Sequence, residues 1–139
     1  MENKLQVGVK ILLKNKVGKF LLVGRSKEKY PDKENPWDIV GGRINQDENL
    51  LTALSREIKE EVGLELVAEP SLVAAQDIFR DDGVHIVRLT YLGEAEGEVK
   101  LDLAENSEYQ WLSWPEIVSL KPDLNKYLQA VLDKIEKRL

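Results

Sequence analysis

The sequence predicts an α/β domain in which a mixed β-sheet lies between helices. Several short runs rich in apolar and β-branched residues are separated by turn residues, as strands are. Two longer segments, residues 48–62 and 123–135, repeat apolar residues with helical spacing. Strands outnumber helices, and both kinds of element carry an apolar side that must be buried against the other kind.

Strands and turns make up the first third of the chain. Residues 7–13 and 20–24 are apolar runs, and the polar residues 14–19 between them predict a hairpin. Residues 37–40 predict a short strand that enters a glycine turn. Residues 26–36 contain two prolines and predict a loop beside that turn, suited to act as a lid or substrate rim.

Residues 48–62 predict a helix with an apolar stripe beside an acidic face. The stripe consists of Leu51, Leu54, Ile58 and Val62. At about 100° per residue, Glu57, Glu60 and Glu61 fall within roughly 100° of one another. Gly63 stands where a left-handed residue ends a helix.

The second half of the chain predicts more strands and two helices. Strands are expected from about residue 64 and at residues 72–75, 85–92, 98–101 and 109–112. Ser113 and Glu116 form a capping-box pattern with Pro115 in the first turn, which predicts a short helix to about Ser119. The segment from Asp123 to Ile135 predicts an amphipathic helix that packs on the sheet.

The acidic face of the first helix indicates a metal site. Like charges one turn apart destabilise a helix by a few tenths of a kcal/mol, so three clustered carboxylates require a cation nearby. Carboxylate oxygens suit Mg²⁺, Mn²⁺ or Ca²⁺, and the two smaller ions usually bind between protein carboxylates and substrate phosphates. The face therefore predicts phosphate chemistry, although a solvated helix surface would carry similar residues.

These residues resemble the signature of the Nudix hydrolases. That signature is a glycine, five residues, a glutamate, seven residues, Arg-Glu, an aliphatic residue, any residue, Glu-Glu, any residue, glycine and an aliphatic residue. It is filled by Gly42, Glu48, Arg56, Glu57, Ile58, Glu60, Glu61, Gly63 and Leu64. Val40 departs from the proline that many relatives carry before the glycine pair.

The resemblance implies the family's α/β/α sandwich and a Mg²⁺ cofactor, for which Mn²⁺ can substitute. The metal ligands it implies are Glu57, Glu60, Glu61 and the main-chain carbonyl of Gly42. In relatives, the glutamate at the position of Glu48 helps to orient the metal ligands or the general base. The alternative is that Glu48 only stabilises the helix, because an acidic residue is favoured near a helix N-terminus. Arg56, on the flank of the acidic face, is expected to hold a carboxylate in position by a charge-assisted hydrogen bond.

The general base and the substrate contact lie partly outside the signature. Relatives use either a signature glutamate or one on a later loop, so Glu57 is the first candidate. Glu105 and Glu108 are the candidates on the later loop, and Glu105 is preferred. The alternative for each is a charged residue on a surface loop with no role in catalysis. Arg25 resembles the phosphate-contacting arginine of relatives, but an exposed arginine at a strand end would look the same in sequence.

The predicted activity is hydrolysis of a phosphoanhydride in a nucleoside diphosphate linked to another group. Nucleoside triphosphates are slightly favoured, and nucleotide sugars or ADP-ribose stay open. The alternative is a noncatalytic nucleotide-binding regulatory module on the same fold, but such modules usually lose a signature carboxylate. An isoprenoid diphosphate isomerase is disfavoured, because relatives with that activity use a cysteine and this chain has none.

Composition limits the partners and the compartment. The 139 residues predict a single domain, residues 1–139, and the net charge of −5 argues against an extended nucleic-acid surface. The beginning of the chain lacks a signal-peptide pattern and no stretch is apolar enough to span a membrane, so a cytoplasmic protein with no membrane contact is expected. Dimers are common in the family, and a homodimer is compatible with the sequence, although no segment identifies an interface.

Overall fold

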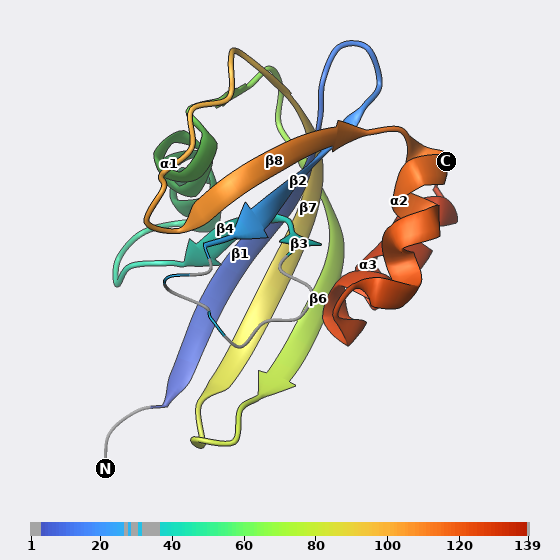
Figure 1. The fold of residues 1–139 in the computed structure, drawn as a ribbon. Helices are drawn as coiled ribbons and strands as arrows, with labels where there is room; N and C mark the ends of the chain where they lie inside the picture. Colours follow the sequence, from blue (N-terminus) through green and yellow to red (C-terminus); the bar gives the residue numbers. More distant parts are fainter. Residues whose placement is uncertain (1–3, 27, 29–30, 32–36, 139) are drawn as a thin grey trace.

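The structure is a computed structural model, and it describes residues 4–26, 28, 31 and 37–138 (Figure 1). The strands are β1 (Leu5–Lys14), β2 (Phe20–Arg25), β3 (Trp37–Asp38), β4 (Val40–Arg43), β5 (Glu65–Leu66), β6 (Ser71–Phe79), β7 (His85–Glu96) and β8 (Asn106–Leu112). The helices are α1 (Leu50–Val62), α2 (Trp114–Leu120), the 3₁₀ turn η1 (Lys121–Asp123) and α3 (Lys126–Glu136).

The sheet is mixed and is built around β1. β1 pairs in parallel with β7 over its whole length, while β2 and β4 pair with it antiparallel on its other edge. β8 extends the sheet from β2, and β6 extends it from β7, both antiparallel. Because β4 pairs with Gly8 to Ile11, in the middle of β1, it brings the glycine turn against the middle of the sheet.

Helices cover both faces of this sheet, as Figure 1 shows. On one face, α1 packs its buried Leu54, Ile58 and Val62 against β1 and β2. On the other face, α2 and α3 bury a second apolar cluster that includes Ile117 and Leu132. The predicted fold class, an α/β fold with a mixed sheet between helices, is confirmed.

The helix α1 is predicted well except at its first turn. It begins at Leu50 rather than Glu48, because the side chain of Asn49 accepts a hydrogen bond from the Thr52 N–H and caps the helix. Leu51 is 38% exposed, so its place in the apolar stripe was wrong. Gly63 ends the helix in the left-handed conformation, as predicted.

The predicted strand at residues 98–101 is wrong. This segment runs past the end of α1, where the N–H of Lys100 bonds to the carbonyl of Val62 and the N–H of Asp102 bonds to the carbonyl of Glu61. These two N–H groups therefore bond to carbonyls that have no partner within the helix at its C-terminus, and they do not pair with a neighbouring strand.

Other boundaries differ by a few residues. The strand expected at 37–40 is interrupted at Ile39, where the chain leaves β2 and joins β1. The strands expected at 72–75 and 85–92 extend to Phe79 and Glu96. The last helix begins at Lys126, after the Asn125 cap, rather than at Asp123.

Most of the loop expected at residues 26–36 lies outside the described residues, so its proposed role as a lid stays a prediction. Within the described part of the chain, no helix combines the length and the apolar character needed to cross a bilayer.

Candidate active site

A cavity of about 740 Å³ opens where α1, the glycine turn and the β6–β7 hairpin meet. One wall carries the carboxylates of Glu57, Glu60 and Glu61, together with Gly42. Its other cationic and acidic lining residues are Lys10, Arg25, Arg43, Arg56, Arg80, Arg88, Asp102 and Glu105. The fold thus places acidic and cationic groups around one space, which suits a polyanion bound through a cation.

Arg56 connects the acidic residues of the predicted site. Its Nη1 donates to Oε1 of Glu57 at 3.0 Å and to Oε2 of Glu60 at 3.2 Å. Its Nε and Nη2 donate to the two oxygens of Glu48. Hydrogen bonds from Arg56 are the main reason that the pKa of Glu48 is lowered to about 2. The arginine therefore contacts three carboxylates of the predicted site.

Glu48 reaches this cluster from the loop before α1. Its Oε1 also accepts the N–H of Asn45 at 2.9 Å, which closes the turn that leads into the helix. An acidic residue that only stabilised the helix N-terminus would not need these hydrogen bonds to Asn45 and Arg56.

Gly42 provides space for Glu57. A Cβ at position 42 would lie 2.7 Å from the carboxyl carbon of Glu57, closer than real atoms approach. The glutamate side chain therefore lies directly against the backbone of β4, with 15% of its surface exposed.

Glu61 is the most buried of the predicted metal ligands. Its Oε2 accepts the N–H of Gly41 at 2.8 Å, and its Oε1 accepts Nδ2 of Asn106 at 3.2 Å. Burial raises the pKa of Glu61 to about 7, although Lys10 and these hydrogen bonds oppose the rise.

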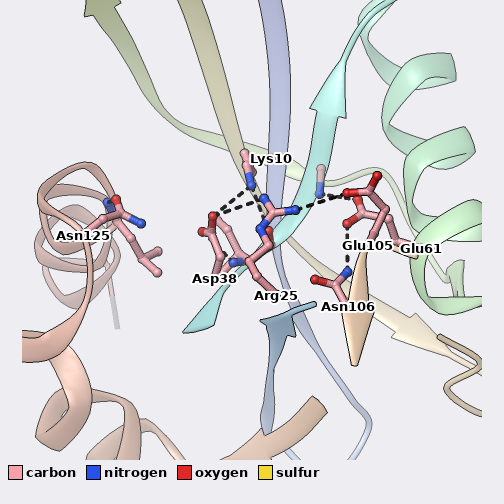
Figure 2. Close-up of polar contacts among 10 residues, drawn as sticks. Lys10, Arg25, Asp38, Glu61, Glu105, Asn106 and Asn125 are labelled. Atoms are coloured by element: carbon pink, nitrogen blue, oxygen red, sulfur yellow. Dashed lines mark hydrogen bonds and ion pairs between the residues drawn. The ribbon is translucent and has the colours of Figure 1, made fainter. Parts of the chain in front are cut away.

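Arg25 lies between two carboxylates at the end of β2. Its Nη2 lies 3.4 Å from Oδ2 of Asp38, and its Nη1 lies 3.7 Å from Oε2 of Glu105 (Figure 2). Only 14% of its side chain is exposed, so the alternative of an exposed strand-end arginine is wrong. Glu105 lines the cavity with Arg25, whereas Glu108 does not line it.

Lys10 and Asp38 form a buried ion pair behind Arg25. Nζ of Lys10 donates to Oδ2 of Asp38 at 3.2 Å and to the carbonyl of Ile39 at 3.1 Å. Burial lowers the pKa of Lys10, while Asp38 opposes this effect. Burial alone would raise the pKa of Asp38, but Lys10, Arg25 and the Ile39 N–H together lower it.

Sequence reasoning missed Asn106, Lys10, Asp38, Arg80 and Arg88. A lysine within an otherwise apolar strand was the available signal for Lys10. Asn106 and Arg88 reach the site through the pairing of strands that are distant in sequence.

The donor set fits a hard divalent cation. Glu57, Glu60 and Glu61 offer carboxylate oxygens beside the main chain of Gly42, where only a glycine leaves room. Among the described residues, no three acidic, histidine or cysteine side chains already converge on one point. Arg56 instead holds one oxygen each of Glu57 and Glu60, and the second oxygens face no hydrogen-bond donor from the described chain.

Comparison with known proteins agrees with this geometry. A MutT protein from Methanosarcina mazei Go1 is 26% identical, with a TM-score of 0.79 over 99% of this chain and 97% of that one. A MutT NUDIX hydrolase from Burkholderia pseudomallei is 24% identical, with a TM-score of 0.75 over 96% of this chain and 99% of that one, and supports the fold alone.

A curated relative matches a shorter part of the chain. An 8-oxo-dGTP diphosphatase from Buchnera aphidicola subsp. Schizaphis graminum is 37% identical over 57 residues. The match covers 41% of this chain and 40% of that protein. The NUDIX domain family, by contrast, matches residues 4–134. Gly42, Arg56, Glu57, Glu60 and Glu61 of the signature line one cavity, and the match over residues 4–134 shows that the chain belongs to the Nudix hydrolase family.

Proposed function

We propose that the chain is a metal-dependent pyrophosphohydrolase that cleaves a phosphoanhydride of a nucleoside diphosphate linked to another group. The observation that carries the proposal is the cavity that Arg56, Glu57 and Glu60 line together with the cationic Arg25 and Arg88. Arg56 holds both glutamates and is itself paired with Glu48. An acidic wall that binds a metal and a cationic wall that meets phosphate oxygens are what hydrolysis of a pyrophosphate requires.

Each side chain has a defined part in the proposed reaction. Glu57, Glu60, Glu61 and the carbonyl of Gly42 would hold Mg²⁺, with Mn²⁺ as a substitute. The bound ion would neutralise phosphate oxygens and favour ionisation of the attacking water. Arg25 contacts a phosphate group, and Arg56 keeps the glutamates aligned. Glu57 is the first candidate to accept the water proton.

Glu105 is the alternative base. It lines the cavity beside Arg25, whereas Glu108 is not among the lining residues. A Glu57→Gln and a Glu105→Gln variant distinguish the two, because loss of the base removes the acidic limb of the pH profile of kcat.

Nucleoside triphosphates are the favoured substrates. The partial match to an 8-oxo-dGTP diphosphatase supports this class, and nucleotide sugars and ADP-ribose are the competing ones. The alternative of a noncatalytic nucleotide-binding module has less support, since every carboxylate of the signature is present and lies near the cavity.

The test is an assay of purified protein with Mg²⁺ over nucleoside triphosphates, 8-oxo-dGTP, nucleotide sugars and ADP-ribose in ¹⁸O-labelled water. The product that carries the label identifies the attacked phosphorus. A Glu60→Gln, Glu61→Gln double variant should lose turnover, and Glu65→Gln, an exposed control on β5, should not. If wild type and double variant both show no turnover but bind nucleotide equally, the regulatory module is the correct function.

A further inference from the structure

We propose that Asn106 is a positioning residue for the metal site. By donating a hydrogen bond to Glu61, it fixes the direction in which this glutamate presents its carboxylate to a divalent cation. The inference rests on the proposed function, because it takes Glu61 as a metal ligand.

The carboxylate of Glu61 is held from two strands at once. The N–H of Gly41 in β4 donates to Oε2, and Nδ2 of Asn106 at the start of β8 donates to Oε1. Figure 2 shows the amide of Asn106 directed at this carboxylate. Glu61 is only 4% exposed, so solvent contributes little to its orientation. Each oxygen has its own donor, which leaves the carboxylate little freedom to rotate.

The main chain of Asn106 is anchored at the start of β8. Its main-chain N–H bonds to the carbonyl of Asp102, and its Cα pairs with that of Arg25 in β2. The donor that Glu61 uses is therefore fixed to the sheet, whereas Glu57 and Glu60 are held by Arg56 of their own helix. Asn106 thus ties this ligand to the sheet side of the cavity.

The surroundings of Asn106 argue against a purely structural role. The residue is fully buried, and its Oδ1 has no hydrogen-bond partner among the described residues. Burying an unpaired amide oxygen destabilises a fold, whereas a leucine of similar volume would avoid that cost. A leucine cannot donate the hydrogen bond that Glu61 accepts from Asn106.

The experiment is a double-mutant cycle read by Mn²⁺ binding to the nucleotide-free protein. Calorimetry compares wild type, Asn106→Leu, Glu61→Gln and the combination of both. Asn106→Leu should weaken Mn²⁺ binding roughly 10-fold, as loss of a group that orients a metal ligand typically does. In the Glu61→Gln background the same substitution should have no further effect, because it acts through Glu61.

Asn125→Ala is the matched control. This asparagine caps α3 through a hydrogen bond from the Leu128 N–H and does not line the cavity. Its replacement should lower the Tm without changing Mn²⁺ affinity. Equal Mn²⁺ affinity of wild type and Asn106→Leu, or fully additive effects in the cycle, would overturn the inference.

A second measurement does not depend on metal or on a folded leucine variant. In ¹⁵N NMR spectra of the metal-free protein at alkaline pH, the side-chain amide signal of Asn106 should move upfield in Glu61→Gln, because its acceptor loses charge. An unmoved signal would show that the contact does not form. If wild type hydrolyses a nucleotide but Asn106→Leu binds Mn²⁺ as tightly as wild type, only this inference is refuted. If Asn106→Leu binds Mn²⁺ more weakly but wild type hydrolyses no nucleotide, only the proposed reaction is refuted.

Discussion

The guanidinium of Arg56 and the carboxylate of Glu48 form a two-pronged ion pair, with Nε 2.7 Å from Oε2 and Nη2 2.9 Å from Oε1. The pair joins the helix α1 to the loop that precedes it. It leaves Nη1 of the same guanidinium directed at Glu57 and Glu60. Glu48 therefore affects the candidate metal ligands through Arg56.

Glu48→Gln should reduce kcat/KM by roughly 10- to 100-fold, because Arg56 loses the charged partner that fixes its orientation. The Tm should change little, since the substitution keeps the side-chain shape. Steady-state kinetics with the best nucleotide of the panel measures the effect. Glu65→Gln, which breaks the exposed pair with Lys59, is the control, and an unaltered kcat/KM in Glu48→Gln would contradict the assigned role.

The two adjacent glycines should respond differently to alanine. In Gly41→Ala the new Cβ would lie 2.1 Å from the carbonyl oxygen of Val9, at a φ of 154°, so unfolding free energy should fall by more than about 2 kcal/mol. In Gly42→Ala the Cβ meets only the mobile end of Glu57, so stability should change little while kcat falls on the order of 100-fold.

Urea unfolding and kinetics on both variants check this contrast. Gly8→Ala is the control for the unfolding measurement, because its Cβ would lie 3.6 Å from the carbonyl oxygen of Gly42, an ordinary contact. Full activity in Gly42→Ala would mean that Glu57 does not need its present position.

The buried pair of Lys10 and Asp38 should show strong coupling in stability. Asp38→Asn leaves the buried lysine without its charged partner and should cost about 3 to 5 kcal/mol. Adding Lys10→Met removes the unpaired charge and should recover most of that loss. Urea unfolding of the single and double variants measures both values. A double variant no more stable than Asp38→Asn would contradict the ion pair.

Stability of the metal-free protein should depend on Glu61. Its folded pKa of about 7 lies above the ordinary value of 4.5, so between these pH values the folded chain binds more protons than the unfolded chain. The contribution of this group is therefore fully present below pH 4.5 and is lost as pH rises through about 7. The change is on the order of 3 kcal/mol at most.

Urea unfolding in EDTA at several pH values between 5 and 8 measures this slope relative to Glu61→Gln. The difference between the two proteins should change with pH, with wild type losing stability relative to the variant toward pH 8. A parallel pH dependence would show that Glu61 titrates as an ordinary carboxyl group.

Much of the fold was predictable because its signals are local. The apolar stripe of α1 and the left-handed Gly63 are sequence features, and both are present in the structure. The supposed strand at 98–101 failed because its N–H groups bond to the end of α1, a contact that an apolar pattern does not reveal. The predicted start of α1 at Glu48 was two residues early, because the side chain of Asn49 caps the helix and the helix begins at Leu50.

The contacts of the candidate site also fall into a local group, which was predictable, and a long-range group, which was not. Arg56 and the signature glutamates lie on or next to one helix, so their spacing alone brings them together. Asn106 meets Glu61 across 45 positions, and Lys10 meets Asp38 across 28. Such contacts depend on the strand register of a mixed sheet, which could not be read from residue patterns.

The most direct test of the account is a calorimetric titration of Mg²⁺ and Mn²⁺ into the protein with a nonhydrolysable nucleoside triphosphate bound. We expect saturable uptake by wild type and none by the Glu60→Gln, Glu61→Gln double variant at the same concentrations. Absence of metal uptake by wild type, or equal uptake by both proteins, would contradict the claim that these carboxylates bind the catalytic cation.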